Sequence, residues 1–127
     1  KYYWPYHHLL QSERKGVRLS VYCHTMAEFG PPIGPGAGQR RPHVCLGDGG
    51  HALPNGWMET MVDCFEVTFG DEVAVNDPFS GGYVTRQHGR MRPWVQLELS
   101  RAPFMTNAQK RSAVINAMSH FCQSVFS

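Results

Sequence analysis

Two side chains in this sequence have the chemistry and the local context of a metal-assisted proton-transfer site. The first is His24, which directly follows the alternating segment 17–23. That segment reads as a strand, and open α/β sheets bind ligands beyond their strand ends. A neutral imidazole there is a good zinc ligand. The alternative is a strand-end histidine that is hydrogen-bonded to a carbonyl.

The second is Glu98, a carboxylate inside a predicted strand at 94–99. Alternation places Val95, Leu97 and Leu99 on one face of that strand and Gln96 and Glu98 on the other. A buried carboxylate is costly unless it meets solvent, a partner charge or a substrate. Beside a metal-bound water it could act as general base and then protonate a leaving amine. The alternative is a solvated strand face.

A third candidate is the glycine-rich segment 76–86. Gly81 and Gly82 allow a backbone to approach a ligand closely, and Arg86 could hold a carboxylate through two parallel N–H bonds. A glycine turn with a surface arginine is the alternative. Asp48 in Gly47-Asp48-Gly49 is interpreted as an Asp-Gly turn.

These residues are carried by interleaved strands and helices, which favour a layered α/β/α fold with a mostly parallel or mixed sheet. Besides 17–23 and 94–99, strands are expected at 43–46 and 72–76, and residues 29–42 read as a loop. A short helix should follow Pro5 and end near Lys15-Gly16, and a second should be capped by Asn55 and end at Gly70. The last helix should begin with a Thr106–Gln109 capping box and bury one apolar stripe. That stripe comprises Val114, Ile115, Met118, Phe121, Cys122 and Val125.

Length, charge and composition indicate which classes of protein and which partners to expect. The 127 residues suffice for one compact domain over 1–127, and the net charge of +2 gives no reason to expect nucleic acid or an anionic membrane as a partner. Apolar runs are too short to cross a bilayer, and no signal peptide is visible, so we expect a cytoplasmic protein. Cys23, Cys45, Cys64 and Cys122 are expected to be buried, reduced thiols.

Five blocks of the sequence, in order, resemble the N-formylglutamate amidohydrolase family. Residues 76–86 resemble its N-D-P-F-x-G-G-Y-x-x-R block, and residues 95–105 resemble A-L-Q-I-E-x-x-R-x-x-Y-M. Tyr22-Cys23-His24-Thr25-Met26 is similar to D-C-H-S-M. Residues 41–48 resemble R-P-D-I-x-L-G-D, and residues 5–10 resemble P-Y-H-x-x-L. The resemblance covers essentially the whole chain.

This resemblance implies a zinc hydrolase with a fold akin to zinc carboxypeptidases and aspartoacylase. His24 would bind zinc, and Glu98 would be the catalytic acid/base. Arg86 and Asn76, with Gly82 and Tyr83, would hold the substrate carboxylate. The implied substrate is N-formyl-L-glutamate or a similar N-acyl acidic amino acid, which is hydrolysed to formate and the amino acid.

The sequence departs from the family in several places. Nothing upstream of His24 matches the family's P-H-S-G-like segment, which supplies further zinc ligands, and Tyr22 stands where the family has Asp. We therefore expect the C-terminal portion of such a domain, which lacks its N-terminal part. Two alternatives are a catalytically incomplete carboxylate-binding module and a subunit that needs an N-terminal partner segment or a second copy. His7 and His8 could in principle replace the missing ligands.

Overall fold

The computed structural model describes residues 16–90 and 92–126. The helix expected after Pro5, together with His7 and His8, lies outside the described residues. The elements follow the order β1 (Ser20–Met26), β2 (Val44–Gly47), α2 (Trp57–Phe69), β3 (Val73–Val75), α3 (Tyr83–His88), β4 (Trp94–Ser100) and α4 (Asn107–Phe126). No described helix combines the length and apolar character needed to cross a membrane.

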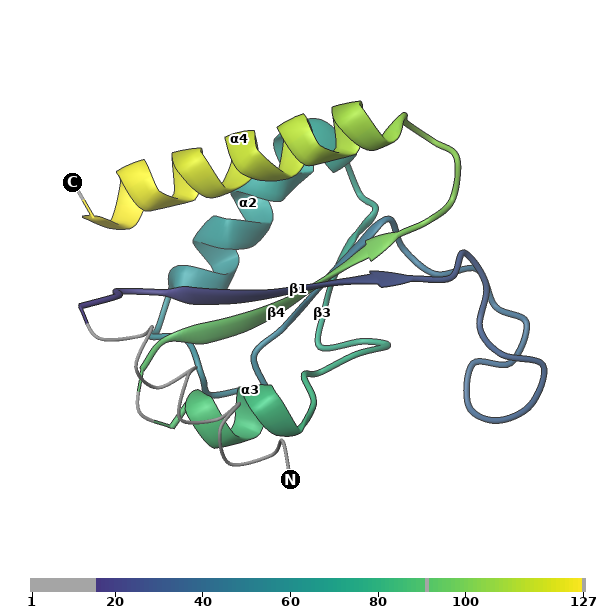
Figure 1. The fold of residues 1–127 in the computed structure, drawn as a ribbon, viewed down its shortest axis with the longest axis horizontal. Helices are drawn as coiled ribbons and strands as arrows, with labels where there is room; N and C mark the ends of the chain where they lie inside the picture. The colour runs from purple at the N-terminus through teal and green to yellow at the C-terminus, as the bar shows by residue number, and fades with distance from the viewer. Residues whose placement is uncertain (1–15, 91, 127) are drawn as a thin grey trace, which may run out of the picture.

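The described strands form one four-stranded mixed sheet in the order β1-β4-β2-β3. β1 runs parallel to β4, β4 runs antiparallel to β2, and β2 runs parallel to β3. Helices α2 and α4 cover one face and α3 lies on the other (Figure 1). The expected α/β fold with a mixed sheet is confirmed.

The position of β1 differs from the prediction. A strand was expected at 17–23, but β1 is Ser20–Met26. It pairs along all of β4, from Ser20 opposite Trp94 to Met26 opposite Ser100. Pairing with a neighbour thus decides where this strand lies, rather than its own alternation. The expectation that His24 follows the strand is wrong, because His24 lies inside it.

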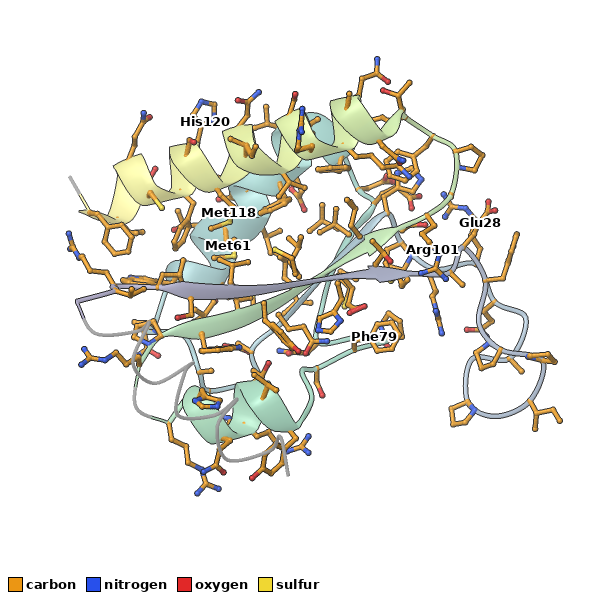
Figure 2. All side chains as sticks on the ribbon, viewed as in Figure 1. Glu28, Met61, Phe79, Arg101, Met118 and His120 are labelled. Atoms are coloured by element: carbon orange, nitrogen blue, oxygen red, sulfur yellow. The ribbon has the colours of Figure 1, made fainter. Side chains whose placement is uncertain are left out.

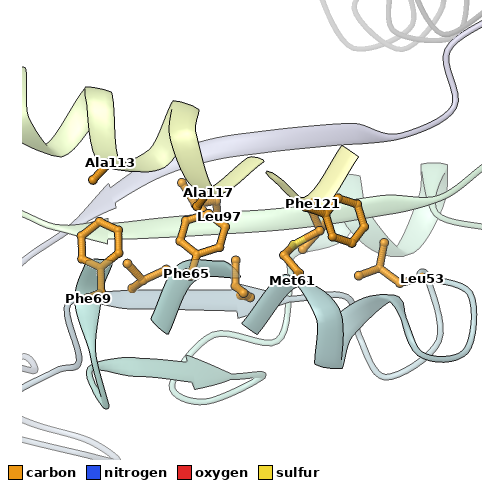
Figure 3. Close-up of a cluster of buried hydrophobic side chains, with 11 residues drawn as sticks. Leu53, Met61, Phe65, Phe69, Leu97, Ala113, Ala117 and Phe121 are labelled. Atoms are coloured by element: carbon orange, nitrogen blue, oxygen red, sulfur yellow. The ribbon is translucent and has the colours of Figure 1, made fainter. Parts of the chain in front are cut away.

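The apolar core fills the space between the sheet and helices α2 and α4 (Figure 3). Met61 and Phe65 from α2, Leu46 and Val95 from the sheet, and Phe121 from α4 are fully buried. Two strands therefore contribute one apolar face each to the same cluster, as their period of two residues requires.

Helix α4 buries the expected stripe in part. Phe121 is fully buried, and four more of the expected residues are partly buried against the core: Val114, Met118, Cys122 and Val125. Its buried residues are Lys110, Ala113, Ala117 and Phe121, whereas Ile115 is 55% exposed. Small alanines at a spacing of four residues let the helix approach α2 closely, so the larger residues lie at the edges of the contact. His120 is exposed on the outer side of α4 (Figure 2).

The helix ends follow the sequence in part. Thr106 and Gln109 form the expected capping box, with backbone N–H to side-chain oxygen distances of 2.9 and 3.1 Å. Gly70 ends α2 as expected. Asn55 does not cap α2, because the N-cap is Gly56 in a left-handed conformation without a side-chain bond.

Candidate active site

The predicted proton-transfer residues lie in one row of side chains on the α3 side of the sheet. His24 on β1 is the direct partner of Glu98 on β4, and Glu98 is in turn opposite Cys45 on β2. Side chains of directly paired residues point to the same face of a sheet. The structure thus brings the imidazole of His24 and the carboxyl of Glu98 together from segments 74 residues apart in sequence (98 − 24).

His24 is exposed, and an aromatic neighbour sets its surroundings. The ring of Tyr22 meets the imidazole edge-on at a centroid distance of 4.3 Å. The family's Asp at this position would offer a carboxylate, whereas Tyr22 packs its ring against the histidine. The imidazole is thus an exposed group on the edge strand β1.

Glu98 is only 6% exposed, so the solvated strand face considered as an alternative is wrong. Burial raises the pKa of its carboxyl group, and His24, a hydrogen bond from Gln96, Arg41 and Arg101 all act in the opposite direction. Desolvation favours the neutral form of a carboxyl, and nearby cations and donors favour the ionised form. A carboxyl with a raised pKa among cations is suited to accept and return a proton.

Cys45 continues the row toward the glycine-rich segment. Its thiol is buried and donates to the carbonyl oxygens of Asp77 and Phe79, at 3.4 and 3.2 Å. Burial raises the pKa of this thiol, so the neutral form is favoured.

Cys64 and Cys122 are half-buried, whereas Cys23 is exposed, so the expectation of buried cysteines is wrong for Cys23.

Gly47 at the end of β2 lets the glycine-rich segment lie directly on the sheet. A Cβ at this position would come within 2.8 Å of Phe79 O and within 2.9 Å of Gly81 N. The Gly49 N–H also donates to Ser80 O at 2.6 Å. Only glycine permits this approach, which holds residues 79–81 beside the row that contains Glu98.

Asn76 and Asp48 tie together the loops that follow β3 and β2. The Asn76 side chain accepts from Asp48 N–H at 3.0 Å and donates to Asp48 Oδ1 at 3.1 Å. Asp48 Oδ1 also accepts from Gly50 N–H at 2.8 Å, which confirms the Asp-Gly turn. Asn76 has the left-handed backbone conformation (φ 56) that asparagine tolerates better than most residues. In this structure its side chain fastens two loops, and its role toward a substrate stays a prediction.

The other predicted substrate-binding residues belong to α3 and its N-cap. Gly82 is the N-cap, and its N–H donates to Gln96 Oε1 at 3.1 Å. Tyr83 is 47% exposed. Arg86 is exposed, and its Nη1 donates to Gly81 O at 3.4 Å. The arginine therefore folds back on the glycine pair, and its role toward a substrate stays a prediction.

Sequence reasoning missed three residues that surround Glu98. Gln96 donates to Glu98 Oε2 from its Nε2 at 3.3 Å. Arg41 and Arg101 act electrostatically on the same carboxyl. The Arg41 guanidinium lies 5.0 Å from the centre of the Phe79 ring, which is on the α3 side of the sheet (Figure 2). The alternation of 94–99 placed Gln96 on the same face as Glu98 but assigned it no role, and no local pattern connects Arg41 with Glu98.

The described residues do not by themselves form a complete zinc site. Within 16–90 and 92–126, no three His, Cys, Asp or Glu side chains are grouped as metal ligands would be. A catalytic zinc normally has three protein ligands. His24 offers one imidazole, so this part of the chain lacks the donor set for such an ion.

A groove of about 860 Å³ lies on the other face, between β1, β4 and α4. Leu97, Leu99, Val114 and Ile115 contribute apolar surface, and Arg101, Lys110 and Arg111 contribute charge. His24 lines this groove as well, whereas Glu98 does not. We place the candidate site on the α3 side, because Glu98 and its hydrogen-bond partner Gln96 are there.

Comparison with known proteins agrees with this arrangement. The family model of N-formylglutamate amidohydrolase matches residues 1–105. The crystal structure of N-formylglutamate amidohydrolase from Ralstonia eutropha JMP134 is similar, with a TM-score of 0.67 and 20% sequence identity. The match covers 94% of this chain and 48% of that one, so the chain spans about half the length of this solved relative. No curated protein matches the sequence significantly. The match of the family model over most of the sequence shows that this chain belongs to the N-formylglutamate amidohydrolase family.

Proposed function

We propose that this chain carries the acid–base half of an amidohydrolase site that cleaves N-formyl-L-glutamate to formate and glutamate. The observation that carries the proposal is the direct pairing of His24 with the buried Glu98, whose carboxyl has a raised pKa among cations. Family membership supports the reaction class. A similar N-acyl acidic amino acid is the related substrate class.

In this proposal Glu98 moves the proton. Its carboxylate takes a proton from the attacking water while the water oxygen bonds to the formyl carbon. The carbon–nitrogen bond then breaks, and Glu98 delivers the proton to the leaving nitrogen, which releases formate and the free amino acid. Arg86 on α3 is proposed to hold a carboxylate of the substrate, together with Asn76, Gly82 and Tyr83.

Zinc dependence is part of the proposal. His24 is proposed as one ligand, because its imidazole is exposed beside Glu98. The remaining ligands would come from outside residues 16–90 and 92–126, since these hold no grouped set of three. We also propose that the outer edge of β1 pairs with a further polypeptide segment or a second copy. Cys23, His24 and Thr25 are all exposed along that strand.

Formate release from N-formyl-L-glutamate tests the proposal. Glu98→Gln keeps the size of the side chain but cannot carry a proton, so turnover should fall at least about 100-fold, in keeping with the usual contribution of a general base. The unfolding free energy should not decrease, because the variant no longer buries an ionisable group. Glu66→Gln, which changes an exposed carboxylate on α2, is the matched control.

Three outcomes discriminate between the readings. Retained turnover in Glu98→Gln would reject the role of Glu98. Absence of turnover in the wild type, with N-formyl-L-glutamate still bound, would favour the carboxylate-binding module. Metal analysis and sizing in solution test zinc dependence and the pairing of β1. Less than one zinc per chain, in an active protein, would contradict the metal assignment.

A further inference from the structure

The side chain of Gln96 joins Glu98 to the glycine-rich segment. Its Oε1 accepts from Gly82 N–H at 3.1 Å and from the Thr85 hydroxyl at 3.4 Å, while its Nε2 donates to Glu98 Oε2 at 3.3 Å. One partly buried amide therefore contacts both the N-terminus of α3 and the proposed catalytic carboxyl.

The chemistry of the partners determines the orientation of this amide. A backbone N–H can only donate, so the oxygen of Gln96 must face Gly82. The NH₂ group is then directed at Glu98, where a carboxyl oxygen accepts its hydrogen. A rotation of the amide by 180° would set the NH₂ group against the Gly82 N–H and break both contacts.

The two partners of Gln96 at the start of α3 both donate to its side-chain oxygen. Gly82 is the N-cap of α3 and has no side chain with which to cap the helix. Thr85 is 1% exposed, so its hydroxyl needs an acceptor inside the protein. Gln96 thus supplies from β4 an acceptor for the N–H of the N-cap residue and for the Thr85 hydroxyl.

We infer that Gln96 is a positioning residue that fixes the carboxyl of Glu98 relative to the N-terminus of α3. This inference rests on the proposed function for its link to turnover, since α3 carries Tyr83 and Arg86 and β4 carries Glu98. A side chain that joins the two groups would hold the proton carrier at a constant distance from a bound substrate. Small misplacements of catalytic groups reduce turnover strongly.

Two substitutions separate the two ends of the amide. Gln96→Leu removes both contacts with little change of volume. Gln96→Glu retains an acceptor for Gly82 but removes the donor to Glu98. Gln87→Leu, at an exposed position on α3, is the matched control. Crystal structures, hydrogen exchange at Gly82 and steady-state kinetics are compared for all four proteins.

We expect kcat for N-formyl-L-glutamate to fall about 10- to 100-fold in both Gln96 variants, as is typical when a partner that orients an active-site group is lost. Gly82 exchange should accelerate in Gln96→Leu but not in Gln96→Glu, and the Glu98 carboxyl should move in both. Gln87→Leu should match the wild type.

The same experiments overturn the inference if kcat and the position of Glu98 are unchanged in both Gln96 variants. An inactive wild type would refute the proposed function instead. In that case the crystal structures and the exchange at Gly82 still decide the positioning role. A displaced Glu98 carboxyl in Gln96→Leu, which adds no charge, supports it, and an unmoved carboxyl rejects it.

Discussion

The two faces of the sheet serve different purposes, although the same strands build both. On the α2/α4 face, Val95 and Leu97 of β4 meet Phe65 and Phe121 in a closed apolar core. On the α3 face, Glu98 of the same strand lies among a histidine, a thiol and an amide. Burial of apolar side chains on the first face stabilises the folded state. Burial of the Glu98 carboxyl on the second face costs part of that free energy.

A substitution in the closed face should have the largest effect on stability. Phe65→Ala removes a fully buried ring that packs between α2, α4 and the sheet. We expect a loss of about 3–5 kcal/mol in the free energy of unfolding, because a large cavity remains in a packed core. Denaturant titration followed by circular dichroism would measure this loss. A loss below about 1 kcal/mol would contradict the assignment of the core to this face.

On the α3 face, the largest loss of stability should come from a residue that fastens loops. Asn76→Ala removes both hydrogen bonds to Asp48 and places alanine at a positive φ. We expect a loss of about 1–3 kcal/mol, because buried Asp48 loses two of its hydrogen bonds. Thermal denaturation would quantify it. Asn76→Gly also removes both hydrogen bonds but tolerates the positive φ, so the difference between the two variants isolates the left-handed conformation.

The cap of α4 provides a smaller effect that is restricted to the closed face. Thr106→Ala removes one half of the capping box and should cost about 1 kcal/mol. It should leave Glu98 and its surroundings unchanged. Chemical denaturation would measure the loss in unfolding free energy. The NMR signals of the backbone amides of β4 would report on the surroundings of Glu98. A shift of the Gln96 and Glu98 signals would show that the two faces are more strongly coupled than the structure indicates.

The smallest expected effect is at the surface and depends on pH. Arg40 pairs with Glu72 at 3.0 Å, and its hydrogen bond lowers the pKa of that carboxyl. A lowered pKa stabilises the folded state above the usual pKa of Glu, and the contribution is lost as pH falls through the folded-state value. The difference in unfolding free energy between wild type and Arg40→Gln should therefore vanish in acid. A difference that grows in acid would contradict this pairing.

Local pattern was sufficient for much of the fold. The alternation of β4, the capping box at Thr106 and the glycine that ends α2 were all predicted from neighbouring residues, because each depends on interactions within a few positions. The resemblance to the family was likewise read from short blocks, and the family model confirms it. The position of β1 depends on its pairing with β4, and for this strand the local pattern predicted a start three residues too early.

The sequence by itself determined which residue types could do chemistry: one imidazole, one carboxyl within a strand and a glycine-rich segment. Only the tertiary structure decided that His24 and Glu98 are direct neighbours, that Glu98 is buried and that Gln96 connects it to α3. The physical reason is that strand register and burial arise from contacts between segments far apart in the chain. The neighbouring residues in the sequence therefore do not indicate these contacts.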